Sequence, residues 1–133
     1  MRSAGNDTTW DDAGSAPTEF VLVGALLTVL TLSVLQLGFA LYVRNVIHDA
    51  AVDGAFYAAL ADTTVQESEQ HTRERIREAV GAAFAEDIVV RESTGSGPPI
   101  VSVVVRAPIP LIGLIGPRGA WEVTARAPVE VLD

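Results

Sequence analysis

The side chains that could support catalysis or bind a metal are few in this chain. Its two histidines are His48 and His71, and both have carboxylates nearby in the sequence. His48, Asp49 and Asp53 are of ligand types that zinc accepts, but the same spacing is ordinary on the solvated face of a helix. The chain has no cysteine, no glycine-rich phosphate loop and no G-x-S-x-G nucleophile motif. We therefore expect no enzyme, no cofactor and no metal site.

The charge balance argues against nucleic acid as a partner. The formal net charge is −8, with nine basic residues against seventeen acidic ones. The one basic cluster, at residues 73–77, is interleaved with glutamates. Phosphate backbones are bound by basic faces, so we expect no nucleic-acid binding.

One carboxylate stands beside a long apolar run. Glu19 directly precedes residues 20–43, which contain no charged side chain. As a helix this run of about 24 residues would be ~36 Å long, enough to cross a hydrocarbon core of about 30 Å. Its hydroxyl residues can bond to carbonyls of their own helix, so they cost little in lipid. The run predicts a single membrane-spanning helix.

The apolar run has two other interpretations. A buried helix of a soluble protein would need more apolar surface around it than 133 residues supply. A cleaved secretory signal would need a basic start and a shorter apolar core. Here Arg2 faces Asp7, Asp11 and Asp12, although a small-x-small site near Ala40 keeps a soluble secreted product as an alternative.

On physical grounds alone, Glu19 marks the end of the span and complements the positive end of a helix dipole. Its surroundings add a motif, since Gly14 is followed by four residues and then by Glu19 and Phe20. This arrangement resembles the processing site of type IV pilin-like proteins, in particular the tight-adherence (Flp) branch.

The resemblance extends beyond the span, over about residues 14–60. The TadE-like family of minor pilins and pseudopilins typically follows its span with an aromatic residue, Arg-Asn and a run of small residues. The matching positions here are Tyr42, Arg44, Asn45, Ala50, Ala51, Gly54 and Ala55.

The resemblance implies specific roles for three residues. Gly14 would precede the cut made by a prepilin peptidase, and Ser15 would become the mature N-terminus. Glu19 would neutralise the new amine, on its own chain or on a neighbouring one, because opposite charges enter lipid more easily when paired.

The resemblance also implies a function. The chain would be a structural minor pilin or pseudopilin of a tight-adherence pilus or a related secretion apparatus. Its partners would be the membrane, the peptidase, other pilin-like subunits and pilus assembly proteins. It would lie in the cytoplasmic membrane as a single-pass protein with its C-terminal unit outside the cytoplasm. A permanently anchored ligand-binding or sensor protein is the alternative.

The helix pattern continues past the apolar run to about residue 62. Ala50, Gly54 and Ala58 share one i,i+4 row, and small residues in such a row let another helix approach closely. These residues are therefore predicted helix-packing positions. The partner is either the protein's own C-terminal unit or another subunit.

A second helix is predicted at residues 65–85, after a helix-start signal at residues 62–64. Its first half is polar and is expected to be a solvated face, with Glu69 and Arg73 paired. Its second half shows the spacing of one buried stripe. The stripe comprises Ile76, Ala79, Val80, Ala83 and Phe84.

The rest of the chain predicts strands. They are expected at residues 88–92, 100–107 and 121–131, with the β-branched second strand central and well covered, and with Pro128 placing the third at an edge. The apolar loop at residues 109–119 either folds over the core or contacts a neighbour. The predicted fold is α+β and pilin-like: a leader (1–14), a membrane-spanning and extended helix (15–62) and an extracytoplasmic unit (63–133).

Overall fold

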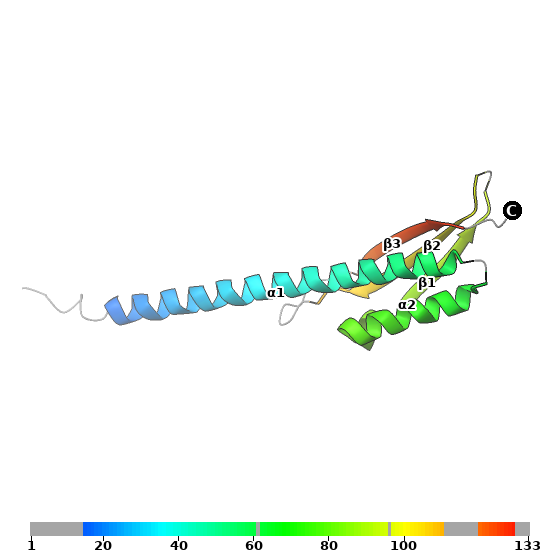
Figure 1. Ribbon diagram of the computed structural model, residues 1–133. Helices are drawn as coiled ribbons and strands as arrows, with labels where there is room; N and C mark the ends of the chain where they lie inside the picture. Colours follow the sequence, from blue (N-terminus) through cyan, green and yellow to red (C-terminus); the bar gives the residue numbers. More distant parts are fainter. Residues whose placement is uncertain (1–14, 61, 96, 111–119, 130–133) are drawn as a thin grey trace, which may run out of the picture. The chain divides into compact units, whose positions relative to one another are not determined.

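The computed structural model describes residues 15–60, 62–95, 97–110 and 120–129. The predicted leader and most of the apolar loop, residues 111–119, lie outside the described residues. The elements are α1 (Ser15–Ala58), α2 (Val65–Val80), the short 3-10 helix η1 (Ala82–Phe84), β1 (Asp87–Ser93), β2 (Ile100–Pro108) and β3 (Ala120–Pro128), as shown in Figure 1. The chain divides into two compact units, residues 1–37 and 38–133, and α1 contributes to both.

In the first unit, α1 begins at Ser15 and carries exposed side chains along residues 15–35. The hydroxyls in this stretch donate to carbonyls of their own helix. Thr28 Oγ1 lies 2.8 Å from the Gly24 carbonyl oxygen, and Ser33 Oγ lies 2.7 Å from that of Val29. Thr31 makes the same kind of bond. This back-bonding confirms the sequence expectation and leaves the helix surface apolar.

The second unit contains a three-stranded sheet of order β1-β2-β3 in which both pairs are antiparallel. As predicted, β2 is central and β3, which ends at Pro128, is an edge strand. The inner face of β2 is fully covered at Val101, Val103 and Val105. Its outer face is more open than the sequence predicted, since Val104 is only half-buried.

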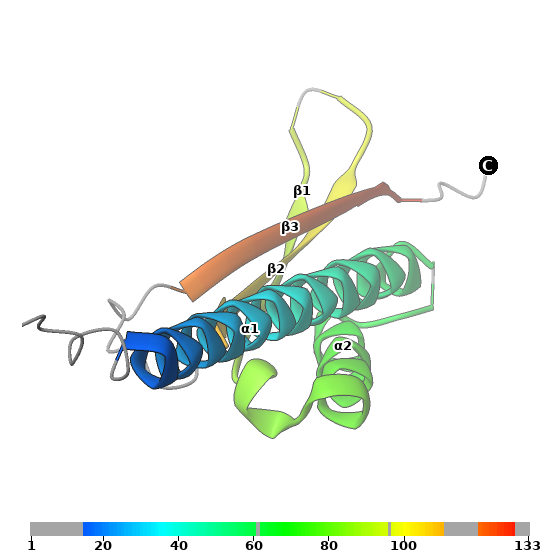
Figure 2. The same ribbon diagram turned by 90° about the vertical axis from the view of Figure 1, so that its left-hand side faces the viewer.

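Helices cover the inner face of the sheet. Figure 2 shows α2 running back beside the C-terminal part of α1, with the strands above them. Val43, Ile47, Ala51 and Ala55 follow one another at intervals of four residues and are fully buried in the core of this unit. After Ile47 this row consists of alanines, whose side chains are short.

The start of α2 follows its local sequence closely. Thr64 Oγ1 accepts from the backbone N–H of Glu67, and the Glu67 carboxylate accepts from the Thr64 N–H at 2.8 Å. This reciprocal arrangement is a capping box. The predicted pair within the helix is also present, with Arg73 Nη2 2.8 Å from Glu69 Oε1.

The end of α2 differs from the sequence prediction. The helix stops at Val80 instead of residue 85, because Gly81 adopts a φ of 105° and breaks the helical path. Ala79 and Ala83 are exposed, so these two members of the predicted stripe are wrong, whereas Ile76 is buried in the core and Val80 and Phe84 pack against it. The stripe that does face the core is made of buried Ser68, Thr72 and Ile76, with half-buried Val65 and Val80 at its ends.

The predicted fold class is confirmed. The chain has a long apolar N-terminal helix, a second helix and a three-stranded antiparallel sheet, an α+β pilin-like architecture. The strands differ from their predicted ranges by one residue at most ends, and β3 ends at Pro128 rather than at residue 131.

Candidate functional site

Two parts of the molecule carry the residues that the sequence singled out, and the first is the start of α1. Gly14 lies outside the described residues, whereas Ser15 is the first residue of α1 and Glu19 follows four residues later. Residues four apart lie on the same face of a helix, about 6 Å apart. Glu19 is exposed, and its spacing of four residues places it on the same face of the helix as Ser15.

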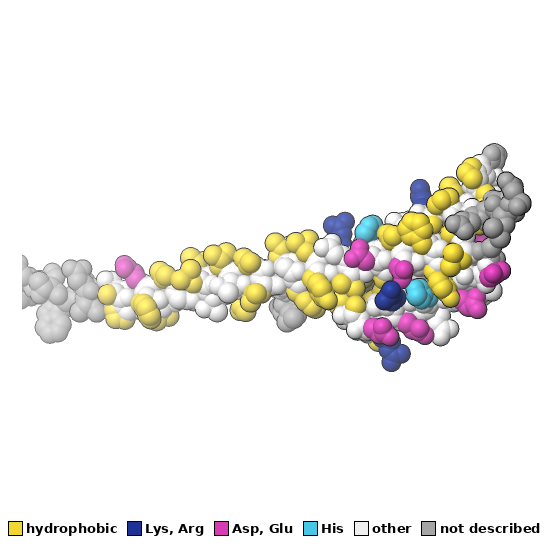
Figure 3. Space-filling model, in the orientation of Figure 1, with side chains coloured by type: hydrophobic (Ala, Val, Ile, Leu, Met, Phe, Trp, Pro, Cys, Tyr) yellow, Lys and Arg dark blue, Asp and Glu magenta, His cyan; other side chains and the backbone are white. Residues whose placement is uncertain are grey.

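The apolar surface that follows Glu19 is exposed all round the helix. Among the described residues, α1 is the one helix long and apolar enough to cross a membrane, and its most apolar window is wholly unburied. The hydrophobic side chains along it are seen in yellow in Figure 3. Ala40 and Val43, at the end of the predicted span, are instead buried within the second unit. The stretch open to lipid is therefore shorter than residues 20–43. From residue 20 to residue 39 it would be ~30 Å long, the thickness of a hydrocarbon core.

The second part is the contact between α1 and α2, centred on Gly54. Ala50, Gly54 and Ala58 are all buried in the second unit. A Cβ on Gly54 would collide with Thr72 Oγ1 and lie 3.2 Å from Thr72 Cβ, so only glycine fits this close approach. The row of small residues therefore contacts the protein's own second helix at Gly54.

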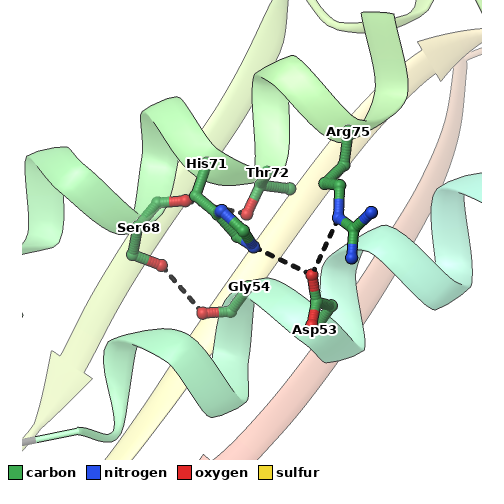
Figure 4. Close-up of polar contacts among 6 residues, drawn as sticks. All are labelled: Asp53, Gly54, Ser68, His71, Thr72 and Arg75. Atoms are coloured by element: carbon green, nitrogen blue, oxygen red, sulfur yellow. Dashed lines mark hydrogen bonds and ion pairs between the residues drawn. The ribbon is translucent and has the colours of Figure 1, made fainter. Parts of the chain in front are cut away.

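Two hydroxyls fill the space that Gly54 leaves. Ser68 Oγ donates to the Gly54 carbonyl oxygen at 2.8 Å, and Thr72 Oγ1 donates to the Ser68 carbonyl oxygen at 2.8 Å (Figure 4). Both side chains are fully buried. Because each hydroxyl has an acceptor, the burial of these polar groups carries no unpaired donor.

Next to this contact, Asp53 joins α1 to two side chains of α2. His71 Nε2 lies 2.9 Å from Asp53 Oδ2, and Arg75 Nε lies 3.2 Å from the same oxygen (Figure 4). The Tyr57 ring stacks on the His71 ring with centroids 4.5 Å apart. The hydrogen bond from His71, helped by Arg75, lowers the pKa of Asp53 below its ordinary value, and partial burial opposes this shift.

Sequence reasoning placed Ser68 and Thr72 on a solvated face, and the structure shows this to be wrong. The missed signal was their spacing, since Ser68, Thr72 and Ile76 follow one another at intervals of four. This row faces Gly54, where the absence of a side chain makes room for small polar groups.

The candidate metal ligands do not form a cluster. The Asp53 carboxylate already contacts His71 and Arg75, and His48 lies on the exposed side of α1. Within the described residues, no three histidine, aspartate or glutamate side chains come close enough to hold a metal ion. The described surface includes two open hollows, each of about 400 Å³ or less. One is lined by Val46, Asp49, Ala50, Asp53 and Arg75, and the other by Arg44, Asn45, His48, Glu122, Val123 and Thr124.

These features define a class of protein: an α+β chain with one apolar helix suited to a single membrane anchor, whose distinctive contacts are helix-packing contacts. Comparison with known protein families finds one match over part of the chain, because residues 14–55 match TadE-like protein. The chain thus carries a TadE-like domain at these residues. No curated protein and no solved structure matches the chain significantly.

The family match indicates a role in the assembly of Tad pili and an association with the Tad pilus assembly machinery. Proteins of this family are generally not enzymes.

Proposed function

We propose that the chain is a structural minor pilin or pseudopilin in the assembly of a tight-adherence pilus or a related secretion apparatus. The observation that supports this most directly is that Ser15, which directly follows Gly14 in the sequence, already lies in α1. A cut between these two residues would release residues 1–14 and leave a chain that begins in helical structure. The family match also starts at residue 14.

Glu19 has a physical role in this proposal. A free amine at a helix N-terminus is unfavourable, because it adds positive charge to the positive end of the helix dipole. Glu19 is one turn away on the same face, so its carboxylate can neutralise the Ser15 amine. The Glu19 carboxylate can pair in the same way with the Ser15 amine of a neighbouring subunit that lies at the same depth in the membrane. The paired charges then enter lipid at a lower cost than either charge alone.

The proposed subunit acts through packing. Its apolar stretch holds it in the cytoplasmic membrane before assembly, and the second unit lies outside the cytoplasm. Prepilin peptidase removes residues 1–14, and the exposed helix surface then contacts other pilin-like subunits. Tyr42, Phe39 and Leu41 remain exposed at the end of the apolar stretch, where such contacts continue.

Coexpression with a prepilin peptidase tests the proposal. Intact mass of the membrane-extracted chain should correspond to residues 15–133, and Gly14→Ala should restore the mass of the full chain. Gly24→Ala is the matched control, because no atom lies within 4 Å of a Cβ at this helical glycine. It should leave cleavage unchanged.

A second arm tests Glu19. Glu19→Ala should leave cleavage intact but abolish incorporation into assembled pili, while Glu19→Asp should retain part of it. Retention of residues 1–14 in native membranes, together with normal assembly of Glu19→Ala, would contradict the proposal. A permanently anchored ligand-binding protein would then be the better account, with the hollow beside Arg44, His48 and Glu122 as its first candidate site.

A further inference from the structure

The outer face of the sheet carries two arginines that have no partner among the described residues. The register places Arg91, Ser102 and Arg126 side by side across β1, β2 and β3. We call these three residues the arginine row. Both arginines are exposed, and neither makes an ion pair with any described residue. Neighbouring strands are ~4.8 Å apart, so the two backbone positions are about 10 Å apart.

The neighbouring charged row on the same face is different, because its charges are already paired. Arg106 Nε lies 2.9 Å from Glu122 Oε2, and Arg106 Nη1 lies 3.7 Å from Asp87 Oδ2. Between the two rows lie the half-buried Val89 and Val104. In a chain with a net charge of −8, the arginine row is thus a local positive site beside a small apolar centre.

The solvent side of α2 carries a row of three carboxylates, flanked around the helix by the exposed Arg75 and Arg77. The Glu67 carboxylate also accepts from the Thr64 N–H, and that of Glu74 accepts from Gln70 Nε2. Glu67, Glu74 and Glu78 are exposed and fall within about 40° of one another around the helix axis, given ~100° per residue. We call these three residues the acidic stripe. From Glu67 to Glu78 it extends for ~16 Å along the helix, long enough to present two carboxylates to arginines about 10 Å apart.

The two surfaces cannot meet within one molecule. The helices cover the inner face of the sheet, whereas the arginine row lies on its outer face. The acidic stripe lies on the side of α2 that points away from the buried Ser68, Thr72 and Ile76. The two surfaces therefore point in opposite directions from one folded unit.

From this geometry we propose that the arginine row of one copy binds the acidic stripe of a second copy. The contact joins two different surfaces, so each bound copy keeps one free surface of each kind. Such a head-to-tail contact continues from copy to copy instead of closing as a dimer. The half-buried valines beside the arginine row would be covered by the neighbour's α2.

This inference rests on the proposed function, because it names the surfaces by which an assembling subunit would contact a copy of itself. It adds a partner and an interface to that function. The two can fail separately, since cleavage after Gly14 and association through these surfaces are independent measurements.

Charge reversal in the full chain, purified in detergent, tests the contact. Arg91→Glu with Arg126→Glu should weaken self-association at low salt at least about tenfold, and Glu74→Arg with Glu78→Arg should do the same. In the first variant the sheet surface and the α2 surface are then both negative, and in the second variant both are positive. A mixture of the two variants, or all four substitutions in one chain, should restore association. Circular dichroism spectra must match the unaltered chain, and Arg91→Gln with Arg126→Gln replaces any variant that fails this check.

Cysteine crosslinking tests the head-to-tail geometry, and the chain has no cysteine of its own. Thr124→Cys lies on the outer sheet face, next to Arg126 in the strand, and Gln70→Cys shares an i,i+4 row with Glu74 and Glu78. A chain with both cysteines should form a disulfide ladder on oxidation, and a mixture of the two single variants should form dimers only.

Three results would overturn the inference. The first is a disulfide dimer of Thr124→Cys alone, which would show a symmetric contact between sheets. The second is a ladder that persists after either charge reversal, and the third is association unaffected by 0.5 M salt at roughly a 4 Å screening length. A ladder that fails while cleavage after Gly14 proceeds would remove this inference and leave the proposed function standing. A ladder that forms in a chain that keeps residues 1–14 would support this inference and count against the proposed function.

Discussion

The two stretches of α1, residues 15–37 and residues 38–58, differ in how their apolar side chains are placed. In residues 15–37 the large hydrophobic side chains are exposed on every side, as at Leu30, which is 57% exposed. In residues 38–58 the buried apolar side chains follow one side of the helix, as at Ile47 and Ala51, which are 0% exposed, whereas large ones such as Phe56 stay exposed on the other side. His48, Asp49 and other polar residues occupy the opposite side.

The difference between the two stretches shows that the size and placement of apolar residues indicate what surrounds a helix. Large hydrophobic residues on every face suit a helix that has the same apolar surroundings on all sides, as a helix in lipid does. Small residues on one face serve a helix that must approach another element closely. The first stretch is therefore explained by lipid or by neighbouring helices, and the second by its own unit.

The largest effect is expected from charges in the first stretch. Leu27→Arg with Leu30→Arg should cost about 5–7 kcal/mol of membrane insertion, at about 2.5–3.5 kcal/mol for each charge near the centre of a span. Carbonate extraction of membranes should then find the chain outside the membrane pellet. The matched control, Asn45→Arg with His48→Arg on exposed positions of the second stretch, should remain in the pellet. Equal behaviour of the two variants would contradict the comparison.

The second effect concerns two glycines of the second stretch, Gly54 and Gly38, of which only Gly54 lies against another helix. Gly54→Ala forces a Cβ against Thr72 and should lower the free energy of unfolding by about 1–3 kcal/mol. Gly38→Ala meets no atom within 4 Å and should raise it by up to about 1 kcal/mol through helix propensity. Chemical unfolding of the full chain in detergent, followed by circular dichroism, measures both. Thr72→Ala should recover part of the loss in the Gly54→Ala background, and its failure to do so would contradict the assigned clash.

A smaller effect separates two serines whose hydroxyls donate to carbonyls. Ser68→Ala removes a buried bond from α2 to α1 and should cost about 1 kcal/mol of unfolding free energy. Ser33→Ala removes an exposed bond within a single helix and should cost close to nothing. The same unfolding measurement tests both. A larger loss for Ser33→Ala would mean that the first stretch makes contacts like those of the second.

The smallest effect is a pH dependence at Asp53. Its pKa is below the model-compound value of 3.8 in the folded protein, so the unfolded chain binds a proton at a higher pH than the folded one. The stability that Asp53 contributes is therefore present above about pH 4 and is lost as the pH falls through its folded pKa. Between pH 5 and pH 3, Asp53→Asn should lose less stability than the unaltered chain. Asp49→Asn, one turn earlier and without an ion pair among the described residues, should follow the unaltered chain.

Much of the fold could be predicted because its signals are local. The alternation along β3 and the Thr64 helix start each depend on a few neighbouring residues. The end of α2 was missed because the helical spacing of apolar residues continues through Gly81, and only the backbone conformation of this glycine shows the break.

The site was less predictable than the fold. The small residues at Ala50, Gly54 and Ala58 were identified as packing positions, but their partner could not be chosen from the sequence. Ser68 and Thr72 are polar, so a hydrophobic pattern places them in water. Their burial depends on the missing side chain of Gly54, fourteen or more residues earlier in the chain. Such a match between two helices is not visible in either one alone.

The central claim is that residues 20–37 face lipid on every side while residues 38–58 face protein on one side only. Single cysteines along α1, labelled in intact membranes with a water-soluble maleimide, test it directly, since the chain has none of its own. We expect no labelling at any position from 22 to 35. In the second stretch, positions 45, 48 and 49 should label, whereas 43, 47 and 51 should not. Labelling that follows a helical period through residues 22–35 would contradict the account, because it would give the first stretch a water-exposed face.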